Sequence, residues 1–81
     1  MTIYQSLSDV VADTITEHKS VIEFFLFLKK QSYTRLEMMI IDSVIKKMPL
    51  ENLHNTLLLT QSDYTELIKS LTKKLKSLKS K

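Results

Sequence analysis

The sequence predicts an all-α fold, a small bundle of about four helices that forms a single domain. Its 81 residues contain no glycine and one proline, Pro49, so left-handed turns and glycine-dependent hairpins are disfavoured while helices lose nothing. Apolar residues recur at spacings of three and four along most of the chain, which is the period of an amphipathic helix. A chain of this length can build only one compact core.

A first amphipathic helix is predicted within residues 1–31. Ser6 and Asp9 form a pair that resembles a capping box, with a hydroxyl at the cap and a carboxylate three residues later. Lys29 and Lys30 suit the C-terminus of this helix, where cations interact favourably with the helix dipole. Its apolar stripe consists of Leu7, Val11, Ile15, His18, Ile22 and Phe25.

The segment from Val21 to Leu28 is apolar around nearly its whole circumference. Such a segment is either buried on all sides or turns a second apolar face toward a partner. A chain this short has little room to bury three phenylalanine rings, so burial in the core and self-association into a homodimer are both open. The residues expected at the dimer seam are Val21, Ile22, Phe24, Phe25, Phe27 and Leu28.

Three further helices are predicted in the second half of the chain. Thr34 with Glu37, and Thr60 with Asp63, repeat the capping-box pattern at the heads of two helical runs. Pro49 ends the run before it, because proline disfavours the α conformation in the preceding residue and suits the first turn of a following helix. The predicted helices are Thr34–Lys47, Leu50–Leu57 and Thr60–Leu75, and a basic tail follows at residues 76–81.

The segment from Tyr33 to Leu75 has the order of a helix-turn-helix: a scaffold helix, a short helix, a tight turn and a longer helix with a basic end. It resembles the DNA-binding domains of LuxR-type regulators and, more loosely, region four of sigma factors. The matched positions are Tyr33, Thr34, Glu37, Ile40 and Ile41 in the scaffold helix, Leu53 in the short helix, Leu58 and Leu59 in the turn, and Tyr64, Leu67 and Ile68 in the recognition helix.

Several features depart from the family's pattern. Lys47 stands where the family usually has glycine, and His54 replaces a small residue that packs between the two helices. The family's usual fourth helix is absent, and the N-terminal helix could take its place. Asp63 and Glu66 put carboxylates on the helix that resembles a recognition helix, where they would face phosphates.

The resemblance implies a small DNA-binding transcriptional regulator of bacterial, phage or plasmid origin, with a recognition helix at residues 60–71 in the major groove. Gln61 would contact adenine through two hydrogen bonds, while the lysines would contact phosphates. The residues expected at the DNA are Thr60, Gln61, Ser62, Thr65, Lys69, Lys73, Lys74 and Lys76. The lysines of the tail are also explained as a solvated chain terminus.

Two other classes of function stay open. The acidic groups on the recognition-like helix and the apolar segment from Val21 to Leu28 favour a protein-binding regulator, such as an anti-activator, an adaptor or a secretion chaperone. A protein that lies on a membrane surface through its lysine tail is less favoured, because that tail has no tryptophan or phenylalanine on its apolar side.

The composition argues against an enzyme. The absence of cysteine removes thiol nucleophiles and the common structural zinc sites, and the absence of glycine removes the loops that bind phosphates through backbone amides. His18 and His54 lie in different predicted helices, so neither a metal site nor a cofactor is expected. The most apolar stretch carries Glu23 and falls well short of the roughly 20 residues that a bilayer demands, which predicts a cytoplasmic protein.

Overall fold

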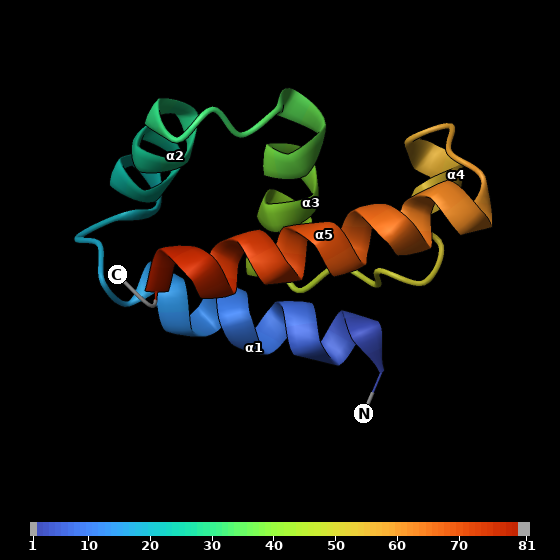
Figure 1. Cartoon of the computed structure of the whole chain (residues 1–81), viewed down its shortest axis with the longest axis horizontal. Coiled ribbons are helices and arrows are strands. Elements are labelled where there is room, and N and C mark those ends of the chain that lie inside the picture. Colours follow the sequence, from blue (N-terminus) through green and yellow to red (C-terminus); the bar gives the residue numbers. More distant parts are fainter. Residues whose placement is uncertain (1, 80–81) are drawn as a thin grey trace.

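The computed structural model describes residues 2–79 and is built from five α-helices (Figure 1). The helices are α1 (Ile3–Ile15), α2 (Val21–Lys30), α3 (Arg35–Ile45), α4 (Leu53–Thr56) and α5 (Gln61–Lys79). Residues 2–79 contain no β-strand. The predicted all-α fold is therefore confirmed.

The longest helix, α5, lies beside α1 and runs in the same direction, and α3 stands across the pair and also contacts α1 (Figure 1). Helices α2 and α4 lie toward opposite ends of the molecule. One core joins all five helices, since each contributes buried apolar residues. The core side chains with no solvent exposure are Leu7, Phe24, Leu28, Ile40, Ile41, Tyr64, Ile68, Leu71 and Leu75.

The N-terminal region forms two helices, whereas the sequence predicted one. Helix α1 starts three residues before Ser6, and Thr2 is its N-cap, because the Thr2 hydroxyl accepts a hydrogen bond from the Gln5 N–H at 3.1 Å. The chain then breaks after Ile15 and restarts at Ser20, whose hydroxyl accepts a hydrogen bond from the Glu23 N–H at 3.2 Å. The break lets α2 fold back over the core instead of extending α1.

Helix α2 contains all the residues that the sequence placed at a dimer seam, and it divides them between the core and the surface. Phe24 and Leu28 have no solvent exposure and belong to this chain's own core. Phe25 and Phe27 are half-buried against that core. Of the expected set, Val21 and Ile22 are the exposed residues, and both lie at the start of α2.

The helix starts predicted at Thr34 and Thr60 are confirmed. Thr34 and Glu37 form a complete capping box, with reciprocal hydrogen bonds of 3.1 and 2.9 Å. The Thr60 hydroxyl accepts a hydrogen bond from the Asp63 N–H at 3.1 Å at the head of α5. The predicted basic tail begins inside this helix, which continues through Lys79, and residues 80 and 81 of that tail lie outside the described residues.

The short helix α4 spans Leu53–Thr56, less than the predicted Leu50–Leu57. The chain enters it through a bend and turn at residues 50–52, and Asn52 provides no side-chain cap for its first N–H groups. Without a cap, a single turn of helix depends on its packing, which Leu53 and Leu50 supply by burial in the core.

Three helices end on a residue in the left-handed conformation, and none of the three is glycine. Ser32, Lys47 and Leu58 have φ angles of 66°, 58° and 59°. After α3, the Lys47 N–H donates to the Val44 carbonyl and the Met48 N–H to the Ser43 carbonyl, which is the Schellman pattern. Helix α3 therefore stops at Ile45, two residues earlier than predicted and before Pro49 exerts its effect.

Replacement of Leu58 with glycine is expected to stabilise the protein by about 0.5–1 kcal/mol. A left-handed residue with a Cβ costs roughly 1–2 kcal/mol, and glycine relieves this cost while it adds entropy to the unfolded chain. Leu58 is 92% exposed, so its side chain contributes little packing. Urea denaturation measures the change, and Leu58→Ala, which keeps the Cβ, is the matched control and should leave stability nearly unchanged.

Helices long and apolar enough to span a bilayer are not found in the described part of the chain.

Candidate nucleic-acid interface

Helix α5 separates an apolar inner face from a lysine-rich outer face. Its inner face is anchored by Tyr64, Ile68, Leu71 and Leu75, which have no solvent exposure. Exposed lysines recur on the opposite side at intervals of four and three residues, which places them in one row along a helix. This row, the α5 lysine stripe, consists of Lys69, Lys73 and Lys76.

A shallow depression of about 210 Å³ lies between α1 and α5 beside the stripe. Lys69 and Lys76 border it, and Thr72 lies between them on the same helix. The α1 side contributes Ile3 and the half-buried Ser6. Two lysines and two hydroxyl residues around this hollow make this part of the surface suited to an anionic group such as a phosphate.

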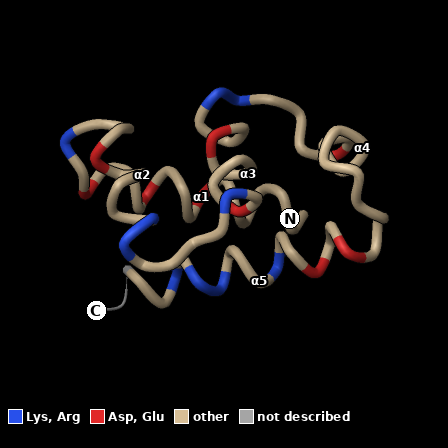
Figure 2. Tube along the Cα trace, turned by 90° about the horizontal axis from the view of Figure 1, so that it is seen from above, with Lys and Arg blue, Asp and Glu red and all other residues tan. Residues whose placement is uncertain are grey.

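The end of α2 and the start of α3 add three exposed basic residues, Lys29, Lys30 and Arg35. The connection between these two helices packs on α5, because the Lys74 ammonium lies 4.4 Å from the centre of the Tyr33 ring. Figure 2 shows basic positions in blue at the end of α2 and the start of α3, and others along α5. The sequence shows these residues as a basic pair followed closely by an arginine. Their place relative to α5 follows only from the fold.

Lys74, which the sequence assigned to DNA, is instead held by the protein. Its ammonium lies 2.9 and 3.1 Å from the two carboxylate oxygens of Glu37. Glu37 itself is only 5% exposed. Burial alone would raise the pKa of Glu37, but hydrogen bonds from the Thr34 backbone and from Lys74 outweigh it and lower the pKa below its ordinary value of 4.5. Lys74 therefore joins α5 to α3 and is not a free phosphate ligand.

Replacement of Lys74 with methionine is expected to lower the free energy of unfolding at neutral pH by about 1–2 kcal/mol, because it leaves a buried carboxylate without its cation. The pKa of Glu37 is lower in the folded state, so the stabilisation is present above about pH 4.5 and is lost as the pH falls through the folded pKa. The difference between Lys74→Met and the native chain should therefore shrink in acid.

The matched control for this pair is Lys73→Met, which removes a neighbouring exposed lysine from the same helix. Its unfolding free energy, measured by urea denaturation across the same pH range, should stay close to that of the native chain. An equal loss of stability in both variants would contradict a specific role for the pair between Lys74 and Glu37.

The predicted base-reading residues at the start of α5 are partly engaged within the protein. Thr60 caps the helix through Asp63, and the Thr65 hydroxyl donates to the Gln61 carbonyl at 2.9 Å. The Gln61 side-chain amide lies 3.4 Å from the Tyr4 hydroxyl, which is a long hydrogen bond on an exposed surface. Of these predicted base-contacting residues, Gln61 therefore has the side chain that can most easily exchange its internal hydrogen bond for one to a ligand.

Carboxylates surround this end of the helix. Ser62 and Gln61 are exposed, but so are Asp63 and Glu66. Glu66 precedes Lys69 by three residues and thus continues the line of the lysine stripe toward the start of the helix. The outer face of α5 is consequently acidic in its first half and basic in its second, and an anionic ligand is attracted to the second half.

Among residues 2–79, two buried polar atoms have no hydrogen-bond partner, the Tyr33 hydroxyl and His54 Nδ1. Burial, and then the nearby Glu37 carboxylate, raises the pKa of Tyr33 to about 12. Within residues 2–79, histidine, aspartate and glutamate side chains do not gather in groups of three or more that could hold a metal ion.

Comparison of the chain with protein-family models, with curated proteins and with solved structures finds no match.

Proposed function

We propose that this protein binds duplex DNA through the second half of α5 and acts as a small, non-enzymatic regulator. The observation that carries the proposal is the α5 lysine stripe, three exposed lysines in one row along the helix, of which Lys69 and Lys76 border the depression between α1 and α5. Lysines in such a row neutralise successive phosphates and release their counterions, which supplies sequence-independent affinity.

The order of the last three helices supports a helix-turn-helix mode of binding. Helices α4 and α5 are separate, joined by a tight turn that includes Leu58 in the left-handed conformation. Lys47, at the position where LuxR-type domains usually have glycine, is also left-handed, which is the conformation that glycine adopts without cost. Because the start of α5 is acidic, we place the main phosphate contacts on the α5 lysine stripe, with Gln61 as the candidate reader of a base.

The proposal is tested by neutralising two lysines of the stripe. The variant Lys69→Gln/Lys73→Gln should bind duplex DNA more weakly, and the slope of log affinity against log salt concentration should fall by about 2, since each lost phosphate contact removes roughly 0.9. Fluorescence anisotropy with a labelled duplex over a salt series measures both quantities.

The matched control is Lys19→Gln/Lys46→Gln, which removes the same net charge from residues outside α5. It should keep the native slope. If both double variants lose affinity equally, binding depends on net charge alone and α5 is not the DNA-binding helix.

A protein-binding regulator is the second candidate function. The observation in its favour is the set of large apolar side chains that the fold leaves exposed, which are Val21, Ile22, Leu26, Met39, Met48 and Leu58. These residues are outside the α5 lysine stripe, so a protein contact and a DNA contact would use different surfaces.

A further inference from the structure

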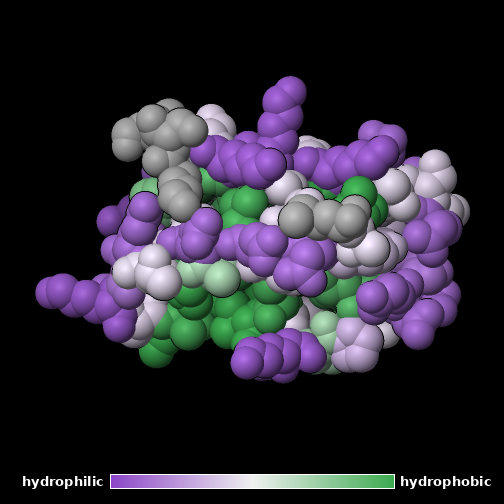
Figure 3. All heavy atoms as spheres, turned by 90° about the horizontal axis from the view of Figure 1, so that it is seen from below, coloured by the Kyte–Doolittle hydropathy of each residue, from purple (hydrophilic) through white to green (hydrophobic). Residues whose placement is uncertain are grey.

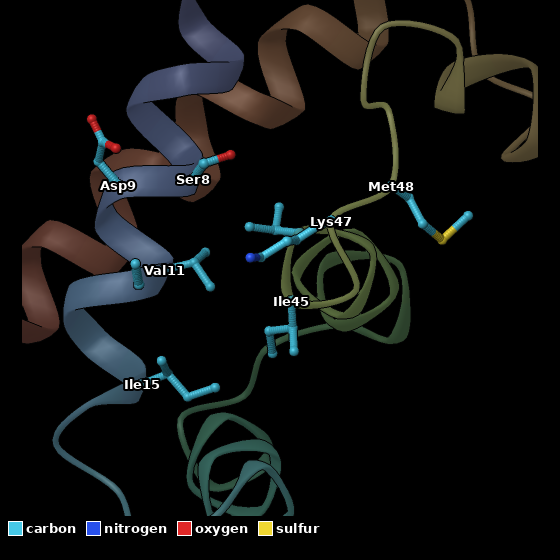
Figure 4. Close-up of a pocket in the computed structure, with 9 residues that line it drawn as sticks. Ser8, Asp9, Val11, Ile15, Ile45, Lys47 and Met48 are labelled. Atoms are coloured by element: carbon cyan, nitrogen blue, oxygen red, sulfur yellow. The ribbon is translucent and has the colours of Figure 1, made fainter.

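A groove of about 520 Å³ lies between α1 and the end of α3. Its walls are mainly apolar: Val11 and Ile15 come from α1, and Val44 and Ile45 come from α3. Figure 4 shows Val11, Ile15 and Ile45 directed into the space between the two helices. The volume is that of a site for a sizeable ligand or for several side chains of a helix.

A single cation reaches into this groove. The Lys47 side chain extends from the end of α3 toward α1, and Asp9 on the opposite wall points away (Figure 4). Asp9 accepts a hydrogen bond from the Gln5 side-chain amide at 2.9 Å. Lys47 has no ion-pair partner among residues 2–79, so the occupant that suits this groove is apolar and carries one acidic group.

The outer face of α2 has this chemistry. Ile22 and Leu26 are 73% and 56% exposed, and they are four residues apart, so they share one face of the helix. Glu23 is exposed and directly follows Ile22, and its carboxylate accepts one hydrogen bond, from the Lys19 N–H at 3.3 Å. We define Ile22, Glu23 and Leu26 as the α2 outer stripe, an aliphatic ridge with one carboxylate beside it.

We propose that the groove between α1 and α3 receives the α2 outer stripe of a second copy of this chain, with Glu23 of each copy facing Lys47 of the other. An amphipathic helix seated in an apolar groove is a recurrent mode of protein recognition. Sequence reasoning placed self-association on α2, but through a set that included the buried Phe24 and Leu28. The structure moves the contact to the opposite face of the same helix.

The positions of the two surfaces suit a symmetric dimer. Figure 4 shows α2 just below the end of the groove, beside Ile15 and Ile45. Seen from below, hydrophobic residues form a broad green area on one face of the molecule (Figure 3). In a dimer with a two-fold axis, the ridge of each copy lies in the groove of the other copy. Such an arrangement is possible when the ridge and the groove are neighbours on one face of the chain. The contact is made twice, which raises the buried area toward the roughly 800 Å² per partner of a stable interface.

The first test is the mass of the native chain in solution, followed by light scattering or sedimentation over a concentration series. The native chain should approach twice 9.5 kDa as its concentration rises. The variant Ile22→Asp/Leu26→Asp should stay at the mass of one chain, with dimerisation weakened by about tenfold or more. Leu58→Asp is the control, since it places one such charge at an exposed leucine outside the groove and should leave dimerisation unchanged.

The second test exchanges the charges. Lys47→Glu and Glu23→Lys should each weaken the dimer, and the chain that carries both substitutions should regain it, because the opposed pair is restored with reversed sign. Circular dichroism checks that each variant keeps its helices, which matters for Glu23 because its carboxylate accepts a hydrogen bond from the Lys19 N–H at 3.3 Å ahead of α2.

Three results would overturn the proposal. One is a native chain that keeps the mass of a monomer up to its solubility limit. Another is a dimer that Ile22→Asp/Leu26→Asp leaves intact. The third is a native chain that stays a monomer and binds the anionic dye 1-anilinonaphthalene-8-sulfonate, with the dye binding lost in Lys47→Glu. The groove would then be a site for a small amphiphile.

Discussion

Replacement of Tyr64 with alanine is expected to unfold the chain at room temperature. Tyr64 has no solvent exposure and lies at the start of α5, where its ring stacks on Tyr4 of α1 at 6.0 Å and contacts His54 of α4 at 5.8 Å. Loss of a large aromatic side chain from a core costs about 3–5 kcal/mol. A chain of this size has a total stability of only about 3–5 kcal/mol, so the variant should show little cooperative unfolding in urea.

The hydroxyl of Tyr64 gives the control for this prediction. It donates to the Leu50 carbonyl at 2.8 Å, and that carbonyl also accepts the Leu53 N–H at 3.2 Å. Tyr64→Phe should therefore remain folded and lose about 1 kcal/mol.

The pKa of Tyr64 is raised from 10.0 to about 12, first by burial and then by the nearby Tyr4 and Glu51. The contribution of Tyr64 to stability should therefore decline as the pH rises from about 10.

Replacement of Phe24 with alanine is expected to cost about 3–5 kcal/mol, which, as in Tyr64→Ala, removes most or all of the stability of the chain. Phe24 is fully buried, and its ring lies 5.3 Å from His18 and 5.9 Å from Phe25. Ile22→Ala is the matched control, because Ile22 is on the same helix but 73% exposed, and it should change stability by less than about 1 kcal/mol.

Thermal and urea unfolding measure both variants. If Phe24→Ala yields a folded monomer of native stability, the ring belongs to an interface between copies and not to the core of one chain.

The helix starts at Thr34 and Thr60 could be predicted because their signals are local. A hydroxyl that caps its own helix needs only the next three residues, and both caps are present in the structure. The inner face of α5 was also predictable, since Tyr64, Ile68 and Leu71 follow the helical period and are all buried.

The break between α1 and α2 could not be predicted from periodicity. His18 and Ile22 continue the spacing of the α1 stripe, so the apolar pattern runs across the break without a change of phase. Ser20 and Glu23 carried the local signal for a new helix, and the structure uses it, with the Glu23 N–H donating to the Ser20 hydroxyl. Two competing patterns were present, and only the fold decides between them.

The role of Lys74 depends on tertiary structure alone. Its partner Glu37 lies on a different helix, 37 positions earlier in the chain, and no local pattern connects the two. The same holds for the groove between α1 and α3, whose walls come from segments separated by about 30 residues. Surfaces of this kind follow from the way helices pack, which spacing along one helix does not determine.

The most direct test of DNA binding is the affinity of the native chain for duplex DNA as a function of salt concentration. If the α5 lysine stripe contacts phosphates, log affinity should fall with log salt at a slope of about 3, close to 0.9 for each of its three lysines. Failure to bind any duplex at low ionic strength, or an affinity that salt leaves unchanged, would contradict the proposed function.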